Sequence, residues 1–170
     1  GNTILASAIG DGSNDEGKVY VFDRTGTNTF NEVGILTGGT YANQGAEFGN
    51  EVKISSNGKT IVVGCGNAEV DEAVSGTGLV HVFDRNPDNT FTRVGVLTGS
   101  YASQSGDAFG YSVDCSGDGN AIVIGAKYDE TGASTSTGVV YVFDRSGNNF
   151  TEVGIITSSS NAATDILGHF

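Results

Sequence analysis

The sequence predicts an all-β fold, and two observations carry that prediction. The octet Gly-Leu-Val-His-Val-Phe-Asp-Arg at 78–85 has near copies at 17–24 and 138–145, so the copies begin 61 and 60 residues apart. The rest of the chain alternates short Val-, Ile- and Phe-rich runs with Gly, Asn, Asp and Ser, without an apolar stripe at helical spacing. Antiparallel strands repeated at such a long period are typical of a β-propeller with four-stranded blades.

The 170 residues divide into three repeats, 1–57, 58–118 and 119–170, which we expect to form one partial propeller. Three blades do not close a ring, and an open ring would leave apolar blade flanks in water. We therefore expect the chain to be part of a longer propeller of roughly six to eight blades. Completion of the ring by a second copy is the alternative.

Each unit begins with two strands joined by a tight turn. In 48–55, Val52 and Ile54 alternate with charged residues, which predicts a strand with one buried face. Asn57-Gly58 then supplies the positive φ angles of a hairpin turn. The second strand is a continuous apolar run and should be covered on both sides; its copies are 3–8, 60–65 and 121–126.

The third strand is the repeated octet, and it ends in an Asp-Arg pair in every copy. A catalytic centre usually breaks repeat symmetry, because one reaction needs different groups in one place. We therefore predict that the Asp caps the hairpin turn and the Arg bonds to a strand edge or to the neighbouring blade. The fourth strand mixes polar and apolar residues and should lie outermost; its copies are 30–37, 91–98 and 150–157.

Short dipeptides at fixed places carry a family resemblance. Phe48-Gly49 and Phe109-Gly110 open the first strand, Gly125-Ala126 closes a second strand, and Val-Tyr-Val-Phe follows. This pattern resembles the FG-GAP repeat, in three copies over essentially the whole chain, although the proline of the name is absent. The next Phe-Gly strand would start at Phe170. The resemblance implies the propeller of integrin α chains and of extracellular microbial proteins, and therefore a secreted or cell-surface location.

The charge balance excludes some partners. Twenty acidic residues oppose eight basic ones, for a net charge of −12. Such a surface repels phosphate backbones, so nucleic acid and anionic membranes are not expected as partners. No apolar run approaches the roughly 18 residues of a membrane span, so no membrane insertion is expected.

Two loops are candidate calcium sites, and two cysteines are candidates for a disulfide. The loop from Asp114 to Asp118 offers calcium-type oxygens but lacks the later acid, and hairpin chemistry explains it without metal. The loop between Asp11 and Glu16 is a second calcium candidate; otherwise we expect no cofactor. Cys65 and Cys115 take apolar positions in the repeat, which favours free thiols, with a disulfide between adjacent repeats as the alternative.

No residue pattern predicts catalysis, so we do not expect an enzyme. His81 takes the position of Tyr20 and Tyr141 in the octet, His169 lies at a variable position, and neither accompanies a nucleophile pattern. Asn149 begins the one N-x-[ST] sequon, in an exposed hairpin, and is a candidate glycosylation site.

The expected function is that of a non-enzymatic extracellular interaction or structural module, part of a larger surface, adhesive or filamentous assembly. Other blades or a second copy would flank it, and protein or glycan ligands would bind the face that carries the variable loops. The alternative is a glycan-binding, lectin-like propeller, with or without calcium. In it, Tyr41 and Tyr101 would stack on sugars; packing of these rings under their own loops is the competing interpretation. An enzyme whose catalytic residues lie in other blades is a third interpretation.

Overall fold

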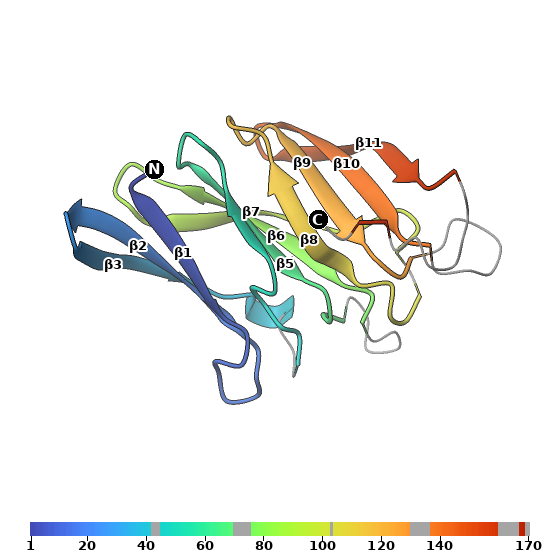
Figure 1. Cartoon of the computed structure of the whole chain (residues 1–170), viewed down its shortest axis with the longest axis horizontal. Coiled ribbons are helices and arrows are strands. Elements are labelled where there is room, and N and C mark those ends of the chain that lie inside the picture. Colours follow the sequence, from blue (N-terminus) through green and yellow to red (C-terminus); the bar gives the residue numbers. More distant parts are fainter. Residues whose placement is uncertain (42–44, 70–75, 103, 130–136, 160–166, 169–170) are drawn as a thin grey trace.

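The computed structural model describes residues 1–41, 45–69, 76–102, 104–129, 137–159 and 167–168, and it contains three antiparallel sheets in sequence order (Figure 1). Blade 1 contains β1 (Thr3–Ala8), β2 (Lys18–Gly26) and β3 (Thr29–Leu36). Blade 2 contains β4 (Val52–Ile54), β5 (Thr60–Cys65), β6 (Leu79–Arg85) and β7 (Phe91–Leu97). Blade 3 contains β8 (Phe109–Cys115), β9 (Ala121–Ala126), β10 (Val139–Ser146) and β11 (Asn149–Thr157).

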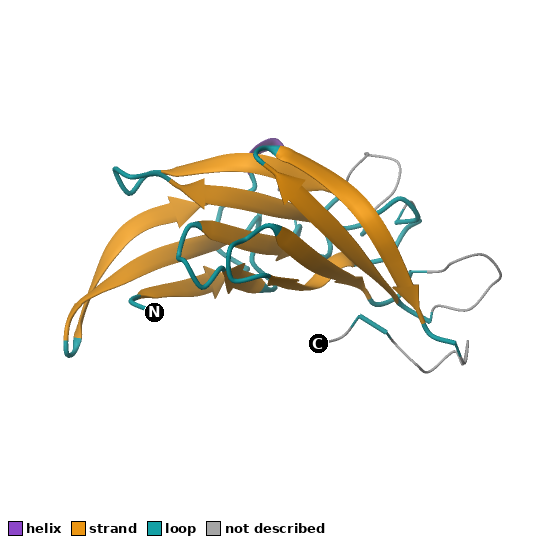
Figure 2. Cartoon of the chain, turned by 90° about the horizontal axis from the view of Figure 1, so that it is seen from above, coloured by secondary structure: helices purple, strands orange, loops and turns teal. Residues whose placement is uncertain are grey.

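The all-β prediction is confirmed, because the described residues add only one 3₁₀ turn, Gly39–Tyr41, to the strands (Figure 2). Each strand pairs with its sequence neighbour in antiparallel register, as in a propeller blade. The sheets are offset by one strand from the repeats of the sequence, because β4 lies before residue 58 but pairs with β5. No helix of the described part is long and apolar enough to cross a membrane.

The apolar core lies between the blades. One buried cluster joins blades 1 and 2 and includes Val21, Phe48 and Ile61; a second joins blades 2 and 3 and includes Val82 and Ile122. Every residue of β5 is buried, as expected for a strand covered on both faces, whereas β1, β3 and β11 are largely exposed and β7 is mostly half-buried. The blades are therefore held together mainly by stacked faces.

A glycine before each third strand fixes how successive units join. Gly17, Gly78 and Gly138 have φ of 87°, 79° and 76°, and a Cβ there would lie 2.0–2.3 Å from a carbonyl oxygen of the following unit. The amides at these contacts donate in the same way: Phe48 to the Glu16 carbonyl (3.1 Å), Phe109 to Thr77 (2.9 Å) and Leu167 to Thr137 (2.8 Å).

Leu167-Gly168 therefore occupies the place of Phe48-Gly49 and Phe109-Gly110. The expectation that this place falls at Phe170 is wrong by three residues. A leucine fills the position because the contact with the glycine uses the backbone, while the side chain only has to be apolar.

The two cysteines are free thiols, so the alternative of a disulfide is wrong. Cys65 is buried, whereas Cys115 is only partly buried. Burial raises the pKa of Cys65 to about 12 and that of Cys115 to about 11, so both remain protonated at neutral pH.

Candidate functional site

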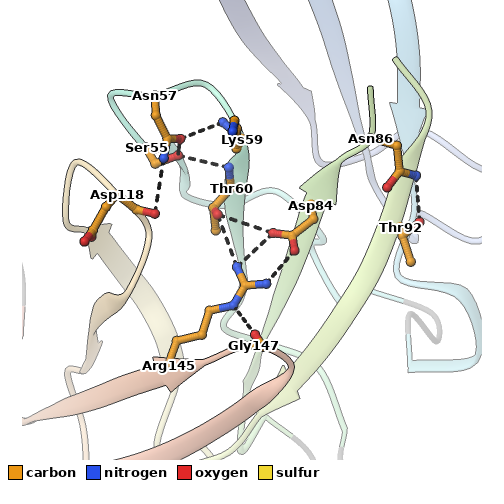
Figure 3. A network of polar contacts seen from close by, with 10 residues as sticks. All are labelled: Ser55, Asn57, Lys59, Thr60, Asp84, Asn86, Thr92, Asp118, Arg145 and Gly147. Carbon is orange, nitrogen blue, oxygen red and sulfur yellow. Dashed lines mark hydrogen bonds and ion pairs between the residues drawn. The ribbon is translucent and has the colours of Figure 1, made fainter. Parts of the chain in front are cut away.

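The Asp-Arg pairs form clamps between neighbouring blades, and Figure 3 shows one of them. Arg145 of blade 3 reaches Asp84 of blade 2, with 2.8 Å between Nη1 and Oδ1, and an ion pair through Nη2 completes a two-pronged contact. The same Nη1 donates to the Thr60 hydroxyl (3.2 Å), and Nε donates to the Gly147 carbonyl (2.7 Å). The guanidinium is thus bonded to both blades.

The clamp between blades 2 and 1 has the same construction. Arg85 pairs with Asp23, with 3.0 Å between Nη1 and Oδ1, and also bonds to the Thr3 hydroxyl (3.1 Å). The Arg85 guanidinium holds the pKa of Asp23 below its ordinary value, against the opposing effect of burial, and the Thr3 hydroxyl lowers it further. The predicted bond from Arg to a neighbouring blade is confirmed; the predicted Asp cap of the hairpin is wrong, because the carboxylate faces the next blade.

The turns between first and second strands are also joined across the blades. In blade 2 the Asn57 side chain accepts from Ser55 (2.7 Å) and from the Lys59 amide (2.9 Å), and in blade 3 Asp118 takes the equivalent place. The Asn57 amide donates to the Gly117 carbonyl (3.1 Å), which links the two turns.

The calcium candidates already carry hydrogen bonds. The Ser116 hydroxyl and the Asn120 amide donate to Asp118 and lower its pKa. In the other loop, the Tyr20 hydroxyl and the Lys18 ammonium bind the carboxylate of Asp11 and lower its pKa. In the described residues, no group of three His, Cys, Asp or Glu side chains could hold a metal ion. Calcium binding by either loop remains a prediction.

A tyrosine–aspartate pair of blades 1 and 3 is absent from the middle blade. In blade 3, the Tyr141 hydroxyl donates to Asp129, which is fully buried, and Tyr20 and Asp11 form the same bond in blade 1. In blade 2 the corresponding residues are His81 and Ala68. The tyrosine position predicted for His81 is confirmed, but the paired change at Ala68 was missed, although aligning the loops shows it. His169 lies outside the described residues.

His81 is completely buried in an aromatic setting. Its ring centroid lies 5.2 Å from that of Phe48, and 6.1 Å from those of Tyr41 and Phe83. Neither ring nitrogen has a hydrogen-bond partner among the described residues. Burial, and secondarily the charge of Arg93, lowers the pKa of His81 to about 3, so the ring is neutral at physiological pH.

Three tyrosines of the variable loops are exposed. The exposed fractions are 39% for Tyr41, 51% for Tyr101 and 47% for Tyr128. The Arg93 guanidinium lies over the Tyr41 ring, 5.4 Å from its centroid. Tyr41 therefore contacts Arg93 of blade 2. Tyr101 is the most exposed of the three.

A cleft of about 360 Å³ lies at the junction of blades 2 and 3 on the loop side, lined in part by Asn50, Tyr111, Lys127 and Tyr128. The Lys127 ammonium sits 3.4 Å from the Tyr111 ring centroid and 4.6 Å from that of Tyr128. The Asn50 side chain bridges the junction by donating to the Tyr111 carbonyl (2.9 Å) and accepting from the Gly66 amide (2.8 Å). A cation between aromatic rings at such a cleft suits a polar ligand.

The sequon residue Asn149 is exposed at the start of β11, and so is Thr151. Its accessibility agrees with the predicted hairpin position. Glycosylation itself remains a prediction.

Residues 92–143, from β7 of blade 2 to β10 of blade 3, match the family model of the FG-GAP repeat. The match spans 52 of the 170 residues and identifies one FG-GAP repeat in that stretch. No curated protein matches the chain. A solved structure from Bacteroides fragilis NCTC 9343, provisionally named as a 6-phosphogluconolactonase, is similar with a TM-score of 0.53 and 16% identity. The similarity covers 82% of this chain and 33% of that one, so the chain spans about a third of that structure. At this identity the likeness shows the propeller fold alone.

Proposed function

We propose that this FG-GAP chain is a non-enzymatic interaction module of an extracellular propeller, serving a larger surface, adhesive or filamentous assembly. The observation that carries the proposal is that one set of side chains joins the blades while a different set is exposed on the loops. The repeated charges, such as Arg85 and Asp23, bond blade to blade, whereas exposed residues such as Tyr101 and Tyr128 lie on the variable loops. Recognition by loops on a rigid scaffold fits that division.

The buried polar groups of the blades also favour a non-enzymatic role. The neutral ring of His81 is enclosed by aromatic residues, and the thiol of Cys65 is buried and protonated. A general base or nucleophile needs access to substrate and a pKa near the working pH.

A second candidate function is glycan binding, with or without calcium. Tyr101 presents an exposed ring, and the separate cleft at the junction of blades 2 and 3 offers Lys127 between two tyrosines. Aromatic faces stack on sugar rings, and the ammonium would favour a carboxylated or sulfated sugar.

Array binding tests both functions. Biotinylated chain, multimerised on streptavidin, is applied to a glycan array and to an array of extracellular proteins, with calcium or with a chelator. We expect signals that Tyr101→Ala and Tyr128→Ala lower at least ~10-fold, while the turn variant Lys59→Ala matches the unmodified chain. Loss of a glycan signal with chelator would assign a calcium requirement.

The contrary outcomes are equally specific. No binding signal on either array overturns the interaction role. No signal on the glycan array, either with calcium or with chelator, removes the lectin candidate. Hydrolysis of 6-phosphogluconolactone above the uncatalysed rate would contradict the non-enzymatic role. Secretion from a eukaryotic host tests Asn149: the expected glycan mass disappears on treatment with an N-glycosidase and in Asn149→Gln.

A further inference from the structure

A phenylalanine at the start of each outer strand fits a glycine of the preceding blade. The Phe91 ring of blade 2 lies where a Cβ on Gly34 of blade 1 would be, only 2.5 Å from that position. The Phe150 ring of blade 3 lies in the same way 2.6 Å from a Cβ position on Gly95 of blade 2. Both glycines leave room for the ring of the next blade.

Gly154 of blade 3 is the third glycine of this set, and nothing fills its place. The nearest atom to a Cβ there is Val142 Cβ, at 4.0 Å within the same blade. Gly154 does not have a positive φ, so its own backbone does not require glycine. The position is therefore shaped for a ring that the three blades do not supply.

The charged clamp ends at the same face. Asp23 and Asp84 each bind an arginine of the next blade, but the equivalent Asp144 is exposed and has no arginine partner among the described residues. Val153 and Ile156 beside it are 53% and 52% exposed. We call Asp144, Val153, Gly154 and Ile156 the acceptor face.

Blade 1 carries the groups that this face lacks. Phe30, the equivalent of Phe91, is 47% exposed, and Ile4 and Ile35 are 46% and 49% exposed. Arg24, the equivalent of Arg85, is exposed and donates to carbonyls of its own turn, Gly26 at 2.9 Å among them. We call Ile4, Arg24, Phe30 and Ile35 the donor face.

We propose that the acceptor face of one chain binds the donor face of a second copy, head to tail. Phe30 of the second copy would fill the space at Gly154, and its Arg24 would pair with Asp144, so that the new interface repeats the two internal ones. The charges are complementary, and the apolar groups on both faces lie beside them. An interface between different faces of identical chains closes into a ring or extends as a filament.

Leu167-Gly168 gives independent support. It takes the place of Phe48 and Phe109, which lead into β4 and β8, through the Leu167 amide bond to Thr137. Blade 1 has three strands, β1 to β3, and lacks the inner strand of the other two blades. In the head-to-tail arrangement, Leu167-Gly168 lies on the side of β1 where that inner strand belongs.

The test measures the mass of the chain by analytical ultracentrifugation between ~1 and ~300 µM. We expect concentration-dependent association. Gly154→Val should raise the dissociation constant at least ~10-fold with unchanged thermal stability of the monomer, because the position is open. Arg24→Glu and Asp144→Arg should each weaken association similarly, and the double variant should restore it by reversing the pair. Lys59→Glu, on a turn, is the control for charge.

A monomer at every concentration overturns the proposal and leaves the acceptor face to a different repeat. Association that Gly154→Val leaves unchanged also overturns it, as does a double variant that is as weak as the singles. The proposal goes beyond ligand binding by the loops, because the array signals of a Gly154→Val monomer report on the loop side separately.

Discussion

Blade 2 is covered on both faces, whereas blades 1 and 3 are each covered on one. Ile61 of β5 is completely buried, but its counterpart Ile4 of β1 is 46% exposed. The same sequence position is thus a core residue in one blade and a surface residue in another. The difference shows that the stable unit is the interface between two blades, and that a repeat alone buries only part of its apolar surface.

The largest expected effect compares those two isoleucines. Ile61→Ala should lower the free energy of unfolding by about 3–4 kcal/mol, because it opens a cavity between blades 1 and 2. Ile4→Ala should cost under about 1 kcal/mol, because its side chain is already half in water. Urea unfolding followed by fluorescence measures both, and equal costs would contradict the comparison.

The next effect is a pH dependence of stability that comes from His81 of the middle blade, where the neighbouring blades have tyrosine. His81 is neutral when buried, with a pKa of about 3, and its unfolded pKa is near 6.5. The unfolded chain therefore binds a proton first, so stability is full above about pH 6.5 and falls by about 2–3 kcal/mol down to pH 4.5. His81→Phe should remove this slope, whereas Tyr141→Phe should leave it in place. Urea midpoints measured across this range test it, and an unchanged slope in His81→Phe would refute it.

Valine at the equivalent glycines Gly95 and Gly154 should show which of the two positions is filled by a phenylalanine ring of the next blade. Gly95→Val should destabilise the chain by about 2 kcal/mol, because it meets the Phe150 ring. Gly154→Val should leave the monomer within about 0.5 kcal/mol of the original. Melting temperatures of dilute samples compare the two, and equal losses would show that Gly154 is not open.

The smallest effect concerns the clamp. Arg145→Met should cost about 1–2 kcal/mol, because it removes the partner of the partly buried Asp84 carboxylate. Arg24→Met should cost under about 0.5 kcal/mol, because Arg24 bonds only within its exposed turn. Unfolding in low and high salt provides the check, since only the Arg145 difference should persist when charges are screened.

Much of the fold could be predicted from sequence because the octet recurs with its strand alternation intact. The exposed outer strands and the buried β5 follow from residue pattern alone. The start at Leu167 was missed because the contact at Gly138 depends on a backbone oxygen, which any apolar residue can supply. A comparison that looks only for a Phe-Gly pair therefore does not identify Leu167-Gly168.

The candidate site could be predicted less well. Asp23 and Arg24 adjoin in sequence, which favours a local turn, yet the partner of Asp23 is Arg85 of the next blade. Only the stacking of the blades decides this. Aligning Ala68 with Asp11 shows that blade 2 lacks the Tyr-Asp bond at His81. The complete burial of the His81 ring could not be predicted from that alignment.

The clamps also impose a direction on how the molecule is made. Arg85 lies 62 positions after Asp23, and Arg145 lies 61 after Asp84. During synthesis from the N-terminus, each aspartate can form its ion pair only after a further unit of about sixty residues has left the ribosome. These two clamps can therefore close only in sequence order, each after the unit that supplies its arginine has been synthesised.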